Sequence, residues 1–165
     1  MADVFTKKKR SAVMAAIRSV GNKATELSLL SLLRQHGITG WRRHQALPGR
    51  PDFLFRRERL AVFVDGCFWH GCKKHLRMPA SNVEYWQKKI ARNLARDRAA
   101  SRLLRQGQWR VLRIWEHELR EPERVLRRVR AALAQSLSSV NLAAPKRGKR
   151  TTVQTAPRMA KKLPL

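Results

Sequence analysis

Acidic residues are scarce in this chain of 165 residues: 11 Asp and Glu stand against 37 Lys and Arg, and no acidic residue follows Glu123. The formal net charge of +26 predicts a polyanionic partner, because each Lys or Arg that neutralises a phosphate releases a condensed counterion. Genomic DNA and ribosomal RNA both satisfy this argument. An anionic membrane satisfies it less well, because no apolar run approaches the roughly 20 residues that span a bilayer and the basic start MADVFTKKKR has no apolar signal segment. We therefore expect a cytoplasmic protein that does not bind membranes.

Cysteine is also scarce: it occurs only at Cys67 and Cys72, and His75 lies three residues after Cys72. In a reducing cytosol this pattern favours metal binding over a disulfide. A structural zinc site takes four Cys or His ligands, and His117 would be the fourth if the strand before it lies beside the strand LAVFVD. The alternative is a pair of reduced cysteines with histidines that face phosphates.

The composition divides the chain into three regions. Residues 1–20 form a basic N-terminal arm, which either lies along a phosphate backbone or is simply solvated. Residues 21–135 have the apolar periodicity of one folded domain, large enough to bury a core without disulfides. Residues 136–165 are rich in Ser, Ala, Pro, Lys and Arg, and we expect a basic, disordered tail that adds nonspecific attraction to nucleic acid.

The periodicity within residues 21–135 predicts alternating helices and strands. Helices are expected from Asn22 to Gly37, from Ser81 to about Gly107 and from Pro122 onward, and strands at 41–46, 52–55, 60–65 and 109–115. This order predicts an α/β domain with a central mixed β-sheet flanked by helices.

Carboxylates at strand ends, with a histidine nearby, indicate a nuclease site. Asp52 begins one predicted strand, Asp65 ends the next, and His70 follows in the loop. Phosphodiester hydrolysis needs a hard cation and a group that orients or deprotonates water, and carboxylate oxygens suit Mg²⁺. Asp52 alone is weak evidence, because an Asp after Pro is usually a turn former. Glu26 lies in the first turn of a predicted helix, where its default role is that of a solvated or dipole-stabilising carboxylate.

Three aromatic residues lie close to this cluster in the sequence. Phe68 and Trp69 are consecutive in the loop, and Trp86 lies on the same predicted helix face as Ile90. From the residues alone, core packing is the favoured interpretation of all three aromatics.

At these residues the chain resembles the very short patch repair (Vsr) mismatch endonucleases. The matching pieces keep the family's order over most of residues 1 to about 120, and they are MADV, ATE, LPGRPDF, VDGCFWHGC, the stretch from Pro79 that ends in EYW, NLARDR and WRVLRIWE. The resemblance implies a fold like that of type II restriction endonucleases. It also implies Mg²⁺-dependent nicking of the T-containing strand of double-stranded DNA at T:G mismatches, which arise when 5-methylcytosine deaminates.

The resemblance further implies partners and a location. We expect a monomer that associates with the nucleoid, a functional link to a DNA cytosine methyltransferase, and a mismatch-repair protein as a partner. Two alternatives stay open: a restriction-type nuclease that cuts matched DNA, and a non-catalytic, zinc-stabilised nucleic-acid-binding protein.

The resemblance also implies roles for individual residues. Asp52 matches the metal-binding aspartate, and the backbone carbonyl of Val64 would also reach the metal. His70 matches the histidine that activates water, a role that its near-neutral pKa suits. Glu26 matches a helix carboxylate that supports the site through water.

Phe68, Trp69 and Trp86 match the aromatics that wedge into the duplex beside the mismatch, and stacking suits these residue types to that task.

Two positions depart from the family pattern. Asp65 stands where the best-known form of the motif has a histidine, so Asp65 is either an extra metal ligand or a group that orients His70. His117 stands where the family has a cysteine, although the two cysteines and two histidines named above still complete a tetrahedral zinc set.

Overall fold

The computed structural model describes residues 25–140 of the chain. The predicted basic arm at 1–20, the predicted helix start at Asn22 and residues 141–165 of the predicted tail lie outside the described residues. Within that range the elements are α2 (Glu26–Gln35), β1 (Trp41–Arg42), β2 (Phe53–Phe55), β3 (Leu60–Asp65), α3 (Val83–Gln106), β4 (Arg110–Trp115), the 3-10 helix η1 (Glu116–Arg120) and α4 (Pro122–Val140).

The strands form one mixed sheet of four in the order β1-β2-β3-β4. β2 pairs antiparallel with both β1 and β3, whereas β4 runs parallel to β3, with Leu60 opposite Arg110 and Asp65 opposite Trp115. A parallel pair needs a crossover connection, and α3 supplies it. The predicted α/β architecture with a mixed sheet is confirmed.

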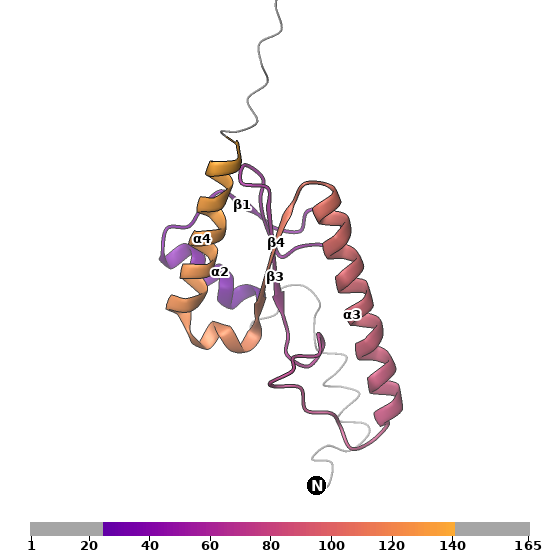
Figure 1. Cartoon of the computed structure of the whole chain (residues 1–165). Helices are drawn as coiled ribbons and strands as arrows, with labels where there is room; N and C mark the ends of the chain where they lie inside the picture. Colours follow the sequence, from indigo (N-terminus) through magenta and orange to yellow (C-terminus); the bar gives the residue numbers. More distant parts are fainter. Residues whose placement is uncertain (1–24, 141–165) are drawn as a thin grey trace, which may run out of the picture.

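Helices cover both faces of the sheet: α2 and α4 lie on one side, and α3 lies on the other (Figure 1). Alternation along β3 directs Leu60, Val62 and Val64 into the core beneath α2 and α4, and directs Ala61 and Phe63 toward α3. Because both faces are covered, every residue of β3 is buried, which explains its almost wholly apolar sequence.

Some element ends differ from the prediction. β1 is shorter than the expected strand at 41–46, because His44 takes a positive φ of 54° that breaks the extended backbone. α4 continues to Val140, past residue 136, where the basic tail was expected to begin. The stop at Gly37 is as predicted: the N–H groups of Gly37 and Ile38 close the helix on the carbonyls of Arg34 and Leu33.

No helix between residues 25 and 140 is both long and apolar enough to cross a membrane.

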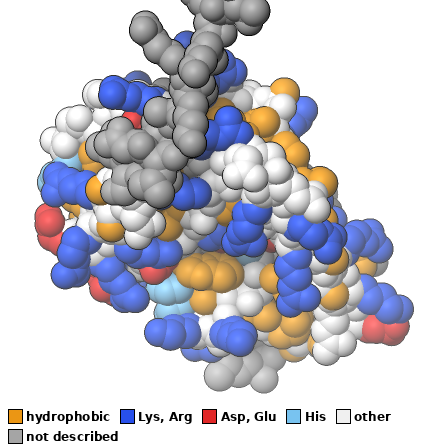
Figure 2. Space-filling view, turned by 45° about the horizontal axis from the view of Figure 1, so that its top comes forward, with side chains coloured by type: hydrophobic (Ala, Val, Ile, Leu, Met, Phe, Trp, Pro, Cys, Tyr) orange, Lys and Arg blue, Asp and Glu red, His pale blue; other side chains and the backbone are white. Residues whose placement is uncertain are grey.

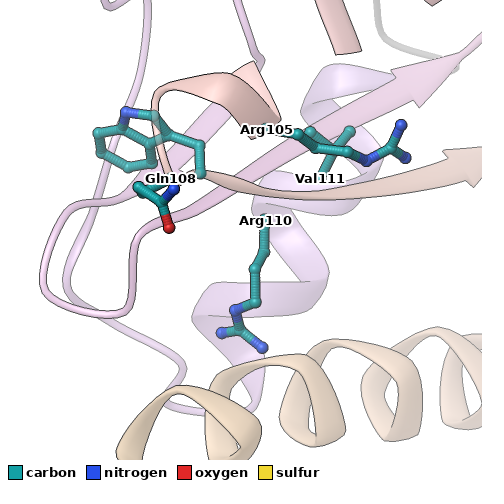
Figure 3. Close-up of a pocket in the computed structure, with 5 residues that line it drawn as sticks. Arg105, Gln108, Arg110 and Val111 are labelled. Atoms are coloured by element: carbon teal, nitrogen blue, oxygen red, sulfur yellow. The ribbon is translucent and has the colours of Figure 1, made fainter. Parts of the chain in front are cut away.

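The two ends of the parallel strand pair differ in character. At the start of β4, a hollow of about 390 Å³ is lined by Arg105, Gln108, Trp109, Arg110 and Val111 (Figure 3). The carboxyl ends of β3 and β4 instead lead into the segments that carry the predicted Cys/His cluster.

Lys and Arg side chains are spread over much of the face in Figure 2, with few acidic ones among them. The predicted basic character is therefore present on the folded domain itself.

Candidate active site and metal centre

Asp52 lies directly before β2 and extends the pairing of β2 with β3 through its side chain. The Val64 N–H donates to Asp52 Oδ2 at 2.7 Å. The pKa of Asp52 is raised from 3.8 to about 6, mainly by burial. The hydrogen bond from Val64 opposes this rise, the charges of Glu26 and Asp65 add to it, and the charge of His70 opposes it. The three other titratable residues predicted for catalysis therefore lie close enough to influence the ionisation of Asp52.

His70 lies in the loop after β3 and contacts a carboxylate from α3. Its Nδ1 is 2.6 Å from Asp97 Oδ2 and 3.7 Å from Asp65 Oδ1. Burial opposes ionisation of Asp97, but the hydrogen bond from His70 and the charges of His70, Arg113 and Arg96 lower the pKa of Asp97 overall. An imidazole that donates from Nδ1 keeps Nε2 as an acceptor. Asp97, and not Asp65, is therefore the carboxylate in direct hydrogen-bond contact with His70.

Sequence patterns did not assign a role to Asp97, although it lies in the NLARDR run. Asp97 is the one acidic residue between Tyr85 and Trp115. An isolated carboxylate in a strongly basic helix was the signal that would have drawn attention to it.

Asp65 ends β3 with its side chain on the α3 side of the sheet, where Arg113 of β4 binds it through two hydrogen bonds. Arg113 Nε donates to Oδ2 at 2.5 Å and Nη2 donates to Oδ1 at 2.6 Å. Burial disfavours the charge of Arg113, but the hydrogen bonds and charges of Asp65 and Asp97 raise the pKa of Arg113 above its ordinary value. Arg113 was not predicted, because its neighbours follow from the strand register and not from sequence spacing.

Glu26 is buried at 3% exposure, which corrects the default expectation of a solvated carboxylate. Its Oε1 accepts hydrogen bonds from both Nε, at 2.8 Å, and Nη2 of Arg43. His44 Nε2 lies 3.6 Å from the same oxygen. Since the charge of Glu26 raises the pKa of Asp52, the start of α2 borders the site.

The predicted zinc ligands lie together. Donor atoms of Cys67, Cys72, His75 and His117 are all within 4.8 Å of one another. Cys67 Sγ is 3.2 Å from His117 Nδ1, and Cys72 Sγ is 3.7 Å from His75 Nδ1. The parallel pairing of β3 with β4 brings the two segments side by side, as the prediction for His117 required. Two thiols and two imidazoles at this spacing fit a tetrahedral zinc ion.

The aromatic residues form one cluster between the loop and α3. Ring centroids are 5.1 Å apart for Phe68 and Trp69, 5.3 Å for Phe68 and Trp86, and 6.1 Å for Trp69 and Trp86. Trp86 is buried, as core packing predicts, whereas Phe68 and Trp69 are half-buried and Tyr85 beside them is 57% exposed. The cluster thus combines a buried residue, Trp86, with aromatic surface that is open to a partner.

The loop that carries these residues is tied down on two sides. The Cys67 N–H donates to Glu116 Oε2 at 3.0 Å, and Asn93 Nδ2 of α3 donates to the Trp69 carbonyl at 3.0 Å. At Gly71 the loop approaches α3 so closely that an added Cβ would lie 3.1 Å from Ile90 Cγ2. The positions of the aromatics and of His70 are therefore set by both η1 and α3.

Comparison with known proteins gives a consistent result. A family model described as DNA mismatch endonuclease Vsr matches residues 2–76. The DNA mismatch endonuclease Vsr of Escherichia coli (strain K12) is 41% identical over 126 residues, which cover 76% of this chain and 80% of that protein. The type II nicking enzyme V.XorIIP of Xanthomonas oryzae pv. oryzae is 38% identical over 120 residues, covering 72% of this chain and 88% of that enzyme.

The type II nicking enzyme V.NaeI of Lentzea aerocolonigenes is 51% identical over a shorter stretch of 69 residues, 42% of each chain. Residues 2–76, which the family model matches, include β1, β2, β3, the loop that carries His70, and the carboxylates of Glu26, Asp52 and Asp65. The chain belongs to the Vsr family of DNA mismatch endonucleases, and it is a DNA endonuclease.

Proposed function

We propose that this enzyme requires Mg²⁺ and nicks the T-containing strand of double-stranded DNA at T:G mismatches that arise when 5-methylcytosine deaminates. The observation that carries the proposal is the convergence of Asp52, His70 and the aromatic cluster around the end of β3, in a chain of the Vsr family. A carboxylate for a cation, a base for water and a wedge for the duplex are the parts that such a reaction needs.

Asp52 and the Val64 carbonyl are the groups that we assign to the cation. The N–H and C=O of one strand residue point to the same side of the strand, so the Val64 carbonyl faces the side on which Asp52 accepts the Val64 N–H. A hard divalent cation prefers oxygen ligands and, when bound, neutralises the charge that develops on the scissile phosphate. Glu26, which influences Asp52 through its charge, supports the site through water.

His70 is assigned the role of general base. Donation from Nδ1 to Asp97 leaves Nε2 to take the proton from the attacking water.

Phe68 and Trp69 are assigned to insertion beside the mismatch, with Trp86. Apolar side chains that enter a base step replace part of the stacking lost when the step opens, and a mismatched step costs less to open. Phe68 and Trp69 are half-buried, whereas Trp86 is only 8% exposed, so in the free enzyme Trp86 supports the other two from α3.

We assign structural zinc to the set of two cysteines and two histidines, and a restriction-endonuclease-like topology to the α/β domain. Zinc held by Cys67, Cys72, His75 and His117 would join the loop after β3 to η1 and so stiffen the support of the aromatics.

We further propose that the enzyme acts as a monomer on the nucleoid, where its charge of +26 favours DNA. A functional link to a DNA cytosine methyltransferase follows from the origin of the mismatch, and a mismatch-repair protein is a further proposed partner.

A nicking assay tests this proposal. The full-length chain is incubated with Mg²⁺ and labelled duplexes that carry T:G or matched pairs in a panel of sequence contexts. We expect a single nick in the T strand, lost in Asp52→Ala with duplex binding retained, and unchanged in Glu121→Ala, a control at an exposed carboxylate. Nicking that survives Asp52→Ala would refute the assignment.

The same assay separates the alternatives. Cleavage of both strands of a matched plasmid would favour a restriction-type nuclease. DNA binding without cleavage, across several divalent cations, would favour a non-catalytic, zinc-stabilised binding protein.

A further inference from the structure

Arg113 of β4 lies inside the site but has no role in the function proposed above. Phe63 is opposite Arg113 in the parallel register, and Asp65 follows two residues later on the same face of β3. The guanidinium lies over the Phe63 ring at 4.9 Å from its centroid, and 26% of the Arg113 side chain is exposed, against 4% for Asp65. The two charges therefore form a largely buried ion pair whose ends are held by adjacent strands.

This pair uses both oxygens of Asp65. The contacts at 2.5 Å and 2.6 Å have the bidentate geometry of a strong, charge-assisted arginine–carboxylate pair. A cation that took Asp65 as a ligand would compete with the positively charged guanidinium for the same two oxygens, and weakening a largely buried ion pair is costly. Asp52, by contrast, gives one oxygen to the Val64 N–H and has a second oxygen for a cation.

The same guanidinium reaches a second carboxylate. Its Nη2 lies 3.4 Å from Asp97 Oδ2, the oxygen that is 2.6 Å from His70 Nδ1. Asp65 and Asp97 both lie near the imidazole of His70, and the positive charge of the Arg113 guanidinium between them offsets the repulsion between the two carboxylates. Arg113 thus stabilises Asp97 in the position from which it holds His70.

We propose that Arg113 is a positioning residue of the active site, which keeps Asp65 out of the coordination sphere of the catalytic cation and holds Asp97 against His70. The kinetic consequences rest on the proposed nicking function. The ion pair between Arg113 and Asp65 is a property of the protein itself and can be measured without turnover.

Nicking kinetics give the first test. Arg113→Met retains a stem that packs on Phe63 but removes the guanidinium, and we expect kcat to fall about 10- to 100-fold, the usual scale for residues that orient catalytic groups. The KM for the duplex and the Mg²⁺ concentration for half-maximal rate should stay unchanged. Arg113→Lys should recover part of the loss. Arg110→Met, at the other end of β4, is the matched control and should nick normally.

A double variant shows whether Arg113 acts through Asp65. Asp65→Asn combined with Arg113→Met should be no slower than Arg113→Met alone, because the single and the double variant lose the same ion pair. If Asp65→Asn raises the Mg²⁺ requirement tenfold or more while Arg113→Met does not, Asp65 is a cation ligand and the inference is overturned. Losses that multiply in the double variant would overturn it as well.

NMR gives a second test that is independent of activity. In ¹⁵N-labelled full-length protein, the Arg113 Nε–H resonance is identified by its loss in Arg113→Lys, and it should shift in Asp65→Asn. With a T:G duplex and Ca²⁺, a cation that also prefers oxygen ligands, the resonance should keep its wild-type position. A shift of the Arg113 Nε–H resonance to its position in Asp65→Asn would overturn the proposal that Arg113 keeps Asp65 from the cation. A wild-type protein that fails to nick would refute the proposed function, while this spectrum still decides the role of Arg113.

Discussion

Replacement of Asp52 by Asn should stabilise the Mg²⁺-free enzyme while abolishing its activity. Burial is the main reason that the pKa of Asp52 rises from 3.8 to about 6. At neutral pH the folded protein therefore carries an ionised carboxylate that the unfolded chain ionises more easily. A shift of about 2 pKa units corresponds to about 3 kcal/mol of free energy of unfolding. Asn removes this cost and can still accept the Val64 N–H through its amide oxygen.

The sign of the effect depends on pH. The folded state binds the proton more tightly, so Asp52 contributes most favourably below about pH 4, and this contribution is lost as the pH rises through about 6. In Mg²⁺-free buffer at pH 7.5, without a chelator that would take zinc, Asp52→Asn should melt on the order of 10 °C higher than wild type. At pH 4 the two proteins should melt together. Added Mg²⁺ should raise the melting temperature of wild type only.

Asp97→Asn is a control of opposite sign. The hydrogen bond from His70 and nearby positive charges outweigh burial and lower the pKa of Asp97, so its stabilising contribution is present at neutral pH and is lost as the pH falls through the folded pKa. Asp97→Asn should therefore destabilise the enzyme at pH 7.5. The reasoning fails if Asp52→Asn is no more stable than wild type at pH 7.5, or if its advantage persists at pH 4.

Two further predictions concern the metal centre and the packing of the sheet. Freshly purified protein should contain about one equivalent of zinc by metal analysis, and Cys72→Ala should lose the zinc and lower the melting temperature, because metal binding to a folded site adds to stability; less than half an equivalent in wild type would contradict the zinc assignment. Gly49→Ala should cost more free energy of unfolding than Gly40→Ala by about 1–3 kcal/mol, because both have positive φ but only at Gly49 would the Cβ meet Ala100 Cβ at 2.8 Å. If urea unfolding shows that the two variants lose the same free energy of unfolding, the close contact at Gly49 carries no cost.

Elements with strong local signals could be predicted from the sequence almost to the residue. LAVFVD is β3 from its first residue to its last, and Pro122 opens α4 as a proline in a first turn should. The strand expected at 41–46 exists but was predicted too long, because its alternation is poor and nothing in the local sequence indicates the positive φ of His44. Local patterns thus predict where a buried strand lies, and they are least informative at a short edge strand.

The same division holds in the site. The Cys/His set could be predicted because its members lie close in sequence, apart from His117, whose place followed from one conditional statement about strand order. Asp97 and Arg113 could not be placed in this way, since their contacts depend on how α3 packs across the sheet and on the register of β3 with β4.

The departure at Asp65 acquires a physical meaning only through that register. The carboxylate of Asp65 adds negative charge beside Asp52 and Asp97, and together with Glu26 it raises the pKa of Asp52. Arg113 on the adjacent strand compensates for that charge with a bidentate pair. Asp65 at the end of β3 therefore has to be considered together with Arg113 of β4. Replacing either residue alone should lower the free energy of unfolding more than replacing both, because a single change leaves the other charge unpaired.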